Sequence, residues 1–178
     1  MTGKHKLLVI IGSAQSGSSN ELLASQLGIQ IPDFEFEIFN RLNELPHFNP
    51  EQSLENPPRT IVEFRDKINR AEGVMICTPE YIFSIPSGLK NALEWCVATT
   101  VFSGKPVGLI TASAHGQKGH EELQLIMHTL TARFTPENTL LISGIKGKLD
   151  NNGVLTDEIT RFKLDQFMDA FRNLIKNN

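Results

Sequence analysis

Short apolar runs alternate with segments of helical periodicity along this chain. Five runs have the length of strands, and each is followed, directly or after a loop, by a segment whose apolar residues recur every three or four positions. The expected strands are 7–11, 34–39, 73–77, 106–111 and 139–142. The expected helices are 20–27, 60–70, 86–98, 119–130 and 156–175. This alternation predicts an α/β fold whose parallel sheet is covered by helices on both faces.

Two runs and one loop differ in their pattern. Residues 7–11 are apolar at every position, which is typical of a strand buried on both faces. Residues 34–39 alternate more strictly, which favours a strand nearer the edge of the sheet. The stretch 40–59 contains four prolines and is expected to be largely irregular, because proline fixes φ and removes a hydrogen-bond donor.

The composition is that of an ordinary globular protein. The chain has 178 residues, of which 40% are hydrophobic and 21% charged, so one domain spanning residues 1–178 is expected. The net charge of −3 gives no basic excess for nucleic acid or an anionic membrane, and no apolar run approaches the roughly 18 residues of a membrane span. Neither nucleic acid nor a membrane is therefore expected as a partner.

The two cysteines and the first residues bear on location. Cys77 and Cys96 lie in apolar surroundings without a CxxC motif, which indicates free buried thiols in a reducing compartment. The apolar run that begins at Leu7 is too short for a signal peptide. A cytoplasmic location is therefore expected.

The fold class points to a place for a ligand. Parallel α/β sheets bind ligands outside the carboxyl ends of their strands, where the strand order reverses. The loops that follow Ile11, Cys77 and Thr111 are therefore the candidates.

The loop after the first strand reads GSAQSGSSN over residues 12–20 and opens a helix. Its small residues let the backbone curl around a ligand, and the start of a helix offers unpaired N–H groups and a positive dipole end to a phosphate. The spacing of Gly12 and Gly17 imitates a Walker A loop, but Ser18 stands where that motif requires lysine. A mononucleotide is therefore favoured over a triphosphate. The alternative is that Ser18 or Ser19 only caps the helix.

The loop after the third strand reads TPEYIFSIPSGLKNALEW over residues 78–95 and contains the only tyrosine, Tyr81. An apolar, proline-stiffened loop with exposed-looking Ile82 and Phe83 suits the face and edge of an aromatic ring system. The alternative is that Phe83 and Ile85 pack into the core or form a subunit interface.

Both loops resemble the NADPH-dependent FMN reductase family. The family pattern is G-S-x-R-x-x-S-x-N after the first strand and P-E-Y-N-x-S-x-P-x-x-L-K-N-A-x-[DE]-W after the third, and residues 12–20 and 79–95 match both at most positions. The resemblance extends to GKP at 104–106 and TAS at 111–113, and so covers roughly the whole domain.

The resemblance implies a flavodoxin-like three-layer sandwich with a five-stranded parallel sheet in the order 2-1-3-4-5. It also implies one bound FMN, NADPH or NADH as electron donor, and a homodimer or homotetramer. The cofactor-binding residues that match the phosphate motif are Ser13, Gln15, Ser18, Ser19 and Asn20. The residues expected around the flavin ring are Pro79, Glu80, Tyr81 and Ile82 on one side and Ser113, Ala114, His115 and Gly116 on the other.

Two positions depart from the family pattern. Gln15 stands where arginine is usual and removes a cation from the phosphate site, and Ile82 stands where asparagine is usual and removes a side-chain partner near the ring. Because charge-assisted hydrogen bonds are roughly twice as strong as neutral ones, weaker FMN retention is expected.

The expected function is that of an FMN-dependent NAD(P)H oxidoreductase. Hydride would pass from NAD(P)H through the flavin to a small acceptor, such as a quinone, an azo compound, a free flavin or a metal oxyanion. No side chain is expected as an obligatory acid or base. The alternatives are a flavin-binding electron carrier or redox sensor with little NAD(P)H turnover, and a mononucleotide-binding module without redox chemistry.

Histidines and glutamates gather after the fourth strand without forming a metal-binding pattern. The spacings of His115, His120, His128, Glu121 and Glu122 match no standard zinc motif, so no metal is expected. His120 and Glu122 are expected on an exposed helix face.

A second polar cluster follows the fifth strand. Lys146 and Lys148 stand beside Gly144 and Gly147, which is typical of a solvated loop. The alternative is that these lysines attract the phosphates of a nucleotide.

Overall fold

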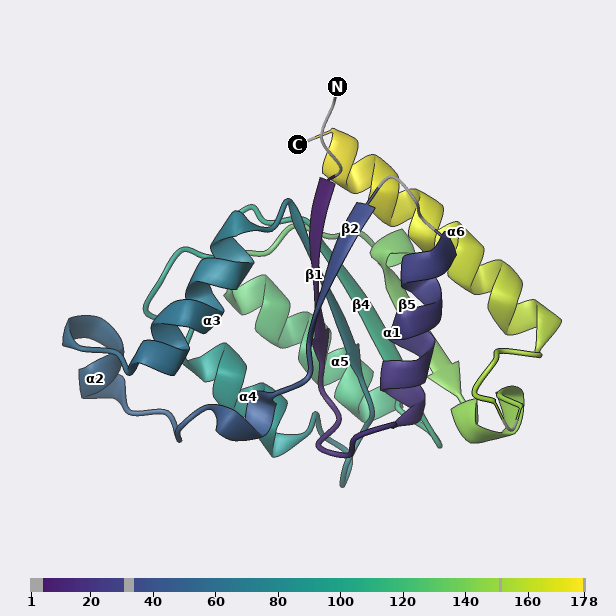
Figure 1. Cartoon of the computed structure of the whole chain (residues 1–178), viewed down its shortest axis with the longest axis horizontal. Coiled ribbons are helices and arrows are strands. Elements are labelled where there is room, and N and C mark those ends of the chain that lie inside the picture. Colours follow the sequence, from purple (N-terminus) through teal and green to yellow (C-terminus); the bar gives the residue numbers. More distant parts are fainter. Residues whose placement is uncertain (1–4, 31–33, 151, 178) are drawn as a thin grey trace.

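A five-stranded parallel sheet forms the centre of the computed structural model, which describes residues 5–30, 34–150 and 152–177 (Figure 1). Its strands are β1 (His5–Ile11), β2 (Phe34–Phe39), β3 (Gly73–Thr78), β4 (Val107–Ser113) and β5 (Thr139–Ser143). Their order is β2-β1-β3-β4-β5, and every neighbouring pair is parallel. The predicted fold and strand order are confirmed, and β2 lies at an edge, as its alternating pattern indicates.

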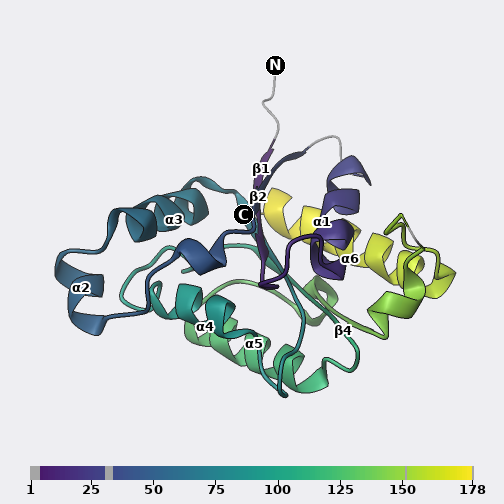
Figure 2. The same cartoon turned by 60° about the horizontal axis from the view of Figure 1, so that its bottom comes forward.

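Helices cover both faces of the sheet, as Figures 1 and 2 show. Helices α1 (Ser19–Gln30) and α6 (Glu158–Lys176) pack on one face. Helices α3 (Arg59–Arg70), α4 (Ser87–Glu94) and α5 (Gln117–Thr129) pack on the other. The apolar faces predicted by the helical periodicity are the faces that meet the sheet.

The central strand β1 contributes to both halves of the core because successive side chains of a strand point to opposite faces. Leu8 and Ile10 pack with α3, α4 and α5, whereas Leu7, Val9 and Ile11 pack with α1 and α6. All five are buried. A strand in this position needs an apolar residue at every step, which explains its unbroken apolar run.

The stretch 40–59 is more regular than expected. It forms a 3-10 turn at Leu42–Glu44 and the short helix α2 (Pro50–Glu55). The side chain of Asn49 accepts a hydrogen bond from Gln52 N at 3.1 Å, and Pro50 occupies the first turn. Asparagine and proline favour these two positions at a helix start, so the prediction of an irregular stretch was wrong at 50–55.

Helix α4 is shorter than its periodicity predicts, because it ends at Glu94 and not at Ala98. Beyond it, Cys96 N donates to Leu93 O at 3.0 Å and Val97 N donates to Glu94 O at 3.1 Å. Hydrogen bonds of this i→i−3 kind tighten the chain into turns. Val97 is consequently exposed.

Candidate functional site

A hollow of about 570 Å³ lies at the carboxyl ends of β1, β3, β4 and β5, and is called the C-terminal hollow below. It is lined by Ser13, Gln15, Gly17, Ser18, Ser19, Asn20, Pro79, Tyr81, Ala112, Ser113, Ala114, Gly144, Ile145, Lys146 and Gly147. Small-molecule sites in proteins have volumes of about 300–1,000 Å³. The hollow is therefore large enough for one mononucleotide, at the edge of the sheet where the topology predicts a ligand.

Most of the site residues predicted from the sequence meet at this hollow. Those that line it are Ser13, Gln15, Ser18, Ser19, Asn20, Pro79, Tyr81, Ser113 and Ala114. Four others do not line it. The Glu80 carboxylate turns toward α5, Ile82 projects into solvent, His115 is exposed beside the hollow, and Gly116 is buried under the start of α5.

The loop after β1 approaches β3 so closely that only glycine fits at its first position. Gly12 N donates to Cys77 O at 2.8 Å. A Cβ atom on Gly12 would lie 2.2 Å from Thr78 Oγ1 and 2.5 Å from Thr78 Cβ, and Thr78 is itself buried. Close approach of two backbones is a typical reason for glycine, and here it fixes where the serine-rich loop begins.

Side chains of nearby residues cap the start of α1. Capping by Ser18 or Ser19 was the alternative from the sequence, and a cap at Ser18 is present. Ser18 Oγ accepts a hydrogen bond from Glu21 N at 3.3 Å, and Glu21 Oε2 accepts one from Gly17 N at 2.8 Å. Asn20 Nδ2 donates to Ala112 O at 3.1 Å and so fastens the helix start to β4. Capping does not consume the site, because the first N–H groups of an α-helix have no partner within the helix.

A tight turn at residues 81–84, called the Tyr81 bend, follows β3. Tyr81 N donates to Ser84 O at 2.9 Å, and Ser84 N donates to Tyr81 O at 3.1 Å. The two residues at its tip, Ile82 and Phe83, have φ values of 51° and 59°. They are 95% and 74% exposed, whereas Ile85 is buried. The alternative that both Phe83 and Ile85 pack into the core is therefore confirmed for Ile85 and wrong for Phe83.

Hydrogen bonds join the three loops around the hollow. The Tyr81 hydroxyl lies 3.4 Å from Ser13 Oγ, which also accepts from Gln15 N at 3.3 Å. Ser113 Oγ donates to Glu80 O at 3.4 Å. The predicted phosphate loop, the Tyr81 bend and the end of β4 therefore form one connected surface.

Two carboxylates fasten the Tyr81 bend to α5. Glu80 accepts hydrogen bonds from Gly116 N at 3.3 Å and Gly119 N at 2.8 Å, as expected for an acidic group at a helix start. Glu122 Oε2 accepts from Ser84 Oγ at 2.6 Å and from Ile85 N at 3.1 Å. Burial alone would raise the pKa of Glu122, but these hydrogen bonds and the nearby Lys90 lower it overall.

The expectation that His120 and Glu122 lie on an exposed helix face is therefore wrong. His120 is only 9% exposed, and its Nδ1 lies 2.8 Å from Thr111 Oγ1. Burial lowers the pKa of His120, although the charge of Glu121 acts in the opposite direction. Both side chains form hydrogen bonds with residues outside α5, which helical periodicity does not reveal.

The cysteines are free and buried, as predicted. Cys77 Sγ lies 3.5 Å from Asn20 O, just beneath the hollow. Burial raises the pKa of the Cys77 thiol to about 12, so it stays protonated and is a poor nucleophile. In the described part of the chain no group of histidine, cysteine and acidic residues could hold a metal ion.

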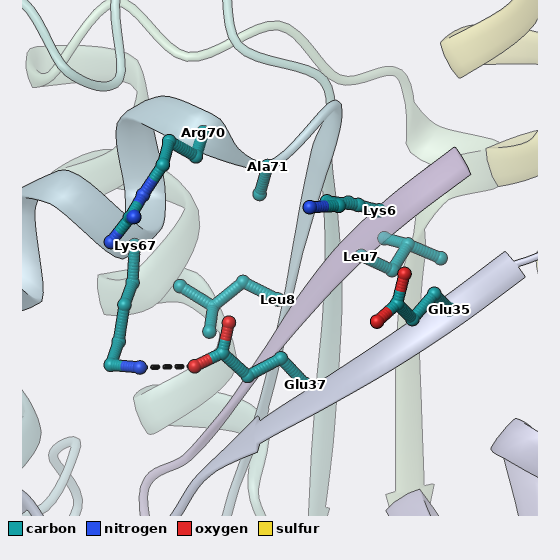
Figure 3. Close-up of a pocket in the computed structure, with 8 residues that line it drawn as sticks. All are labelled: Lys6, Leu7, Leu8, Glu35, Glu37, Lys67, Arg70 and Ala71. Atoms are coloured by element: carbon teal, nitrogen blue, oxygen red, sulfur yellow. Dashed lines mark hydrogen bonds and ion pairs between the residues drawn. The ribbon is translucent and has the colours of Figure 1, made fainter. Parts of the chain in front are cut away.

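A smaller hollow of about 240 Å³ lies at the opposite end of the sheet, between β1, β2 and α3 (Figure 3). Its lining carries several charged side chains, and Lys67 Nζ forms an ion pair with Glu37 across it (Figure 3). It lies toward the amino ends of the strands, away from the edge that binds ligands in this topology. None of the helices within the described ranges is long and apolar enough to cross a bilayer.

A model of the NADPH-dependent FMN reductase family matches residues 5–147. The chain belongs to this family. The NADH-dependent flavin reductase subunit 2 of Lactobacillus johnsonii is 32% identical over 184 residues, covering 96% of both chains. The 2-hydroxy-1,4-benzoquinone reductase of a Burkholderia species is 31% identical over 180 residues, covering 97% of both.

Solved structures share the same fold. The flavoenzyme NAD(P)H:(acceptor) oxidoreductase FerB from Paracoccus denitrificans aligns with a TM-score of 0.78 at 24% identity, over 97% of this chain and 98% of that one. The family model confirms the resemblance seen in the sequence motifs. As a member of the FMN reductase family, the chain is an oxidoreductase that uses FMN and a nicotinamide electron donor.

The C-terminal hollow of this FMN reductase fits its cofactor chemically. The start of α1 and the serine hydroxyls of residues 13–19 offer donors to a single phosphate. Pro79 and Tyr81 add a partly apolar wall to the same hollow. These are the residue types that a mononucleotide with an aromatic ring requires.

Proposed function

We propose that this FMN reductase passes electrons from NADH or NADPH to small quinones or free flavins. The single observation that carries the proposal is the C-terminal hollow, which brings the serine-lined start of α1 and the Pro79–Tyr81 wall together. The named activities of two relatives support this choice of acceptors, because one is a flavin reductase and the other a benzoquinone reductase.

In this proposal the cofactor lies along the hollow with its phosphate at α1. Ser13, Ser18, Ser19 and the N–H groups at the helix start bind the phosphate, with Gln15 at the rim and Asn20 holding the helix start on β4. Pro79 and Tyr81 line one side of the ring, and Ser113 and Ala114 line the other.

The remaining predicted site residues act at the mouth of the hollow or through their neighbours. Glu80 is a positioning residue, because its carboxylate fastens the Tyr81 bend to α5. Gly116, at a φ of 92°, forms the turn that receives it. Ile82 and His115 are exposed at the rim, where they meet the nicotinamide donor or the acceptor.

Bound FMN supplies hydride transfer in both half-reactions. The protein orients the ring, and the Ser13–Tyr81 contact at 3.4 Å fixes the wall against which it lies. None of the described side chains that line the hollow is a carboxylate or an imidazole. In this proposal the proton that a reduced quinone takes up comes from water.

We include assembly and location in the proposal. Exposed apolar side chains on the Tyr81 bend, after α4 and on α5 support a homodimer or homotetramer. They are Ile82, Phe83, Val97 and Leu125. The two buried free thiols support a cytoplasmic location, because free thiols persist in reducing compartments.

The decisive experiment is an anaerobic spectrum. FMN-loaded protein is mixed with NADH or NADPH, and the visible absorbance of the oxidised flavin is followed. We expect at least one nucleotide to bleach it, and benzoquinone or free riboflavin to restore it. If neither nucleotide bleaches the bound flavin, the reductase proposal fails and the electron-carrier alternative is favoured.

One observation favours a second candidate function. The Lactobacillus johnsonii relative is named as a subunit of its reductase. In this second proposal the chain reduces its FMN with NADH or NADPH but delivers the electrons to a partner protein. The same spectrum separates the two, because bleaching would then occur while benzoquinone and free riboflavin restored the colour only slowly.

A further inference from the structure

The turn after β5 brings a cation to the C-terminal hollow. The turn Ile145–Lys148 follows Gly144, and Lys146 lines the same hollow as Ser18 and Ser19 at the start of α1. Among the described residues of the lining, Lys146 is the only side chain with a full charge. A phosphate monoester carries about −1.5 to −2 charges at neutral pH, so a single cation in this hollow matters.

Contacts on both sides fix the backbone of this turn. Gly144 N donates to Ala114 O at 3.1 Å, and Ser143 Oγ donates to His115 O at 2.7 Å, which joins the turn to the end of β4. Ile145 is buried in the core beneath α1 and α6. On the far side, Thr156 N donates to Lys148 O at 2.8 Å. The backbone at Lys146 is thus positioned before any ligand binds.

The two lysines of the turn have different surroundings. Lys148 Nζ donates to Thr160 Oγ1 at 2.7 Å and lies 3.8 Å from Asp157, so it is engaged at the start of α6. Lys146 is exposed and forms no ion pair with the described residues. Lys148 does not line the hollow, so the chain itself provides a matched control two residues away.

The loop after β1 supplies no cation of its own. Gln15 is neutral, and the nearest charge is the carboxylate of Glu21, which accepts from Gly17 N at 2.8 Å and from Asn40 Nδ2 at 2.7 Å. A carboxylate at this place disfavours a second anion, because like charges repel. An anion at the start of α1 therefore needs a positive charge from another element.

We propose that Lys146 binds the phosphate of FMN from the β5 side of the hollow. It supplies the positive charge that the first loop lacks at Gln15. This assignment rests on the proposed position of FMN, with its phosphate at α1. Lysine is a common phosphate-binding residue because it acts as a point charge without strict geometry.

The test compares FMN with riboflavin, which has the same ring and no phosphate. Apo-protein is titrated into each flavin while flavin fluorescence is followed, for the wild type, Lys146→Gln and Lys148→Gln. We expect Lys146→Gln to weaken FMN binding by about tenfold, as the loss of one charged hydrogen bond predicts. The affinity of Lys146→Gln for riboflavin should stay within about twofold of that of the wild type, and Lys148→Gln should change the affinity for neither flavin. Added salt should reduce the difference in FMN affinity between the wild type and Lys146→Gln.

A compensating variant sharpens the result. Gln15→Arg, added to Lys146→Gln, returns a cation to the phosphate from the other side and should restore FMN affinity. Equal losses for FMN and riboflavin, or a raised KM for NADPH with unchanged FMN affinity, would overturn the assignment. FMN binding that Lys146→Gln leaves unchanged overturns this inference alone, whereas a wild-type chain that binds no FMN overturns the proposed function as well.

Discussion

At the scale of single residues, one glycine decides how the first loop meets the third strand. Gly12 has no room for a side chain, because Thr78 Oγ1 would lie 2.2 Å from a Cβ atom and Leu89 Cδ2 only 3.1 Å away. Both neighbours are buried and cannot move into solvent. The position of the serine-rich loop, and hence of one end of the hollow, depends on this contact.

Gly12→Ala tests that dependence. We expect the free energy of unfolding to fall by about 1–3 kcal/mol, the usual cost of forcing an extra methyl group into a packed core. We also expect weaker FMN binding, because the loop must shift. Urea denaturation of the apo-protein measures the first effect, and fluorescence titration with FMN measures the second.

Gly28 provides the matched control. Gly28 lies within helix α1, and a Cβ atom there would make an ordinary contact of 3.5 Å with Phe36. Gly28→Ala should therefore raise the free energy of unfolding by about 0.5–1 kcal/mol, since alanine is the better helix former. A Gly12→Ala variant as stable as the wild type would show that the loop does not need its close approach to β3.

At the scale of elements, α5 does more than cover the sheet. Its start receives the Glu80 carboxylate, and one turn later Glu122 binds Ser84 and Ile85. Gly119 allows this contact, because a Cβ atom there would lie 3.2 Å from both Glu80 Cβ and Ser84 O. The helix therefore positions the Tyr81 bend, and with it one wall of the hollow.

The buried His120 gives α5 a dependence on pH. Burial lowers the pKa of folded His120 below its ordinary value of 6.5, with Glu121 opposing the shift. In the unfolded chain this histidine takes up a proton near pH 6.5, whereas folded His120 stays neutral to lower pH. Protonation therefore favours the unfolded state, and stability falls as the pH drops below about 6.5.

His120→Asn isolates this effect. We expect the free energy of unfolding of the wild type to decrease between about pH 7.5 and pH 5.5, and that of the variant to decrease less. Urea denaturation at several pH values measures the difference, and the other histidines cancel in the comparison. Equal slopes for both proteins would mean that His120 is protonated as readily in the folded state as in the unfolded one.

Sequence patterns predicted the elements of this fold well where the residue types of a short segment reflect one requirement, such as burial or a tight turn. The unbroken apolar run of β1 reflects burial on both faces, and both strands lie where the patterns placed them. The alternation of β2 matches burial at Phe34 and partial burial at Phe36, but Ile38 is exposed and Phe39 is buried on the opposite face. The glycine-serine loop after β1 was recognised because a tight turn and a helix start need particular residue types.

The features that sequence reasoning missed depend on partners in other elements of the fold. Nothing in the periodicity of α5 shows that His120 meets Thr111 or that Glu122 meets Ser84. For Lys146 the sequence left two alternatives, a solvated loop or a lysine that attracts a nucleotide's phosphates, because only the packing of β5 beside β4 shows that its turn reaches the hollow. Helix α2 is different, since the Asn49–Pro50 start signal was present but outweighed by the other prolines.

At the scale of the whole molecule, the exposed apolar side chains beside the Tyr81 bend need an explanation. Ile82 and Phe83 adopt left-handed conformations that cost an L-residue about 1–2 kcal/mol each, and they present their side chains to solvent. Leu125 on α5, the helix that fastens the bend, is 68% exposed. A subunit interface over this region would bury all three and make use of the strained tip.

Leu125→Lys tests this interface, and Phe162→Lys on α6 is its control. Both are apolar side chains on helices with similar exposed fractions, 68% for Leu125 and 63% for Phe162. Burying an unpaired ammonium group is costly, so a lysine at a subunit contact should dissociate the assembly. We expect sedimentation to show that the wild type and the Phe162→Lys variant are assembled. The Leu125→Lys variant should dissociate at protein concentrations at least tenfold higher than those at which the wild type dissociates. A tenfold change corresponds to about 1.4 kcal/mol of association free energy. The reverse pattern would place the interface on α6, and the apolar tip of the Tyr81 bend would then face the nicotinamide donor or the acceptor.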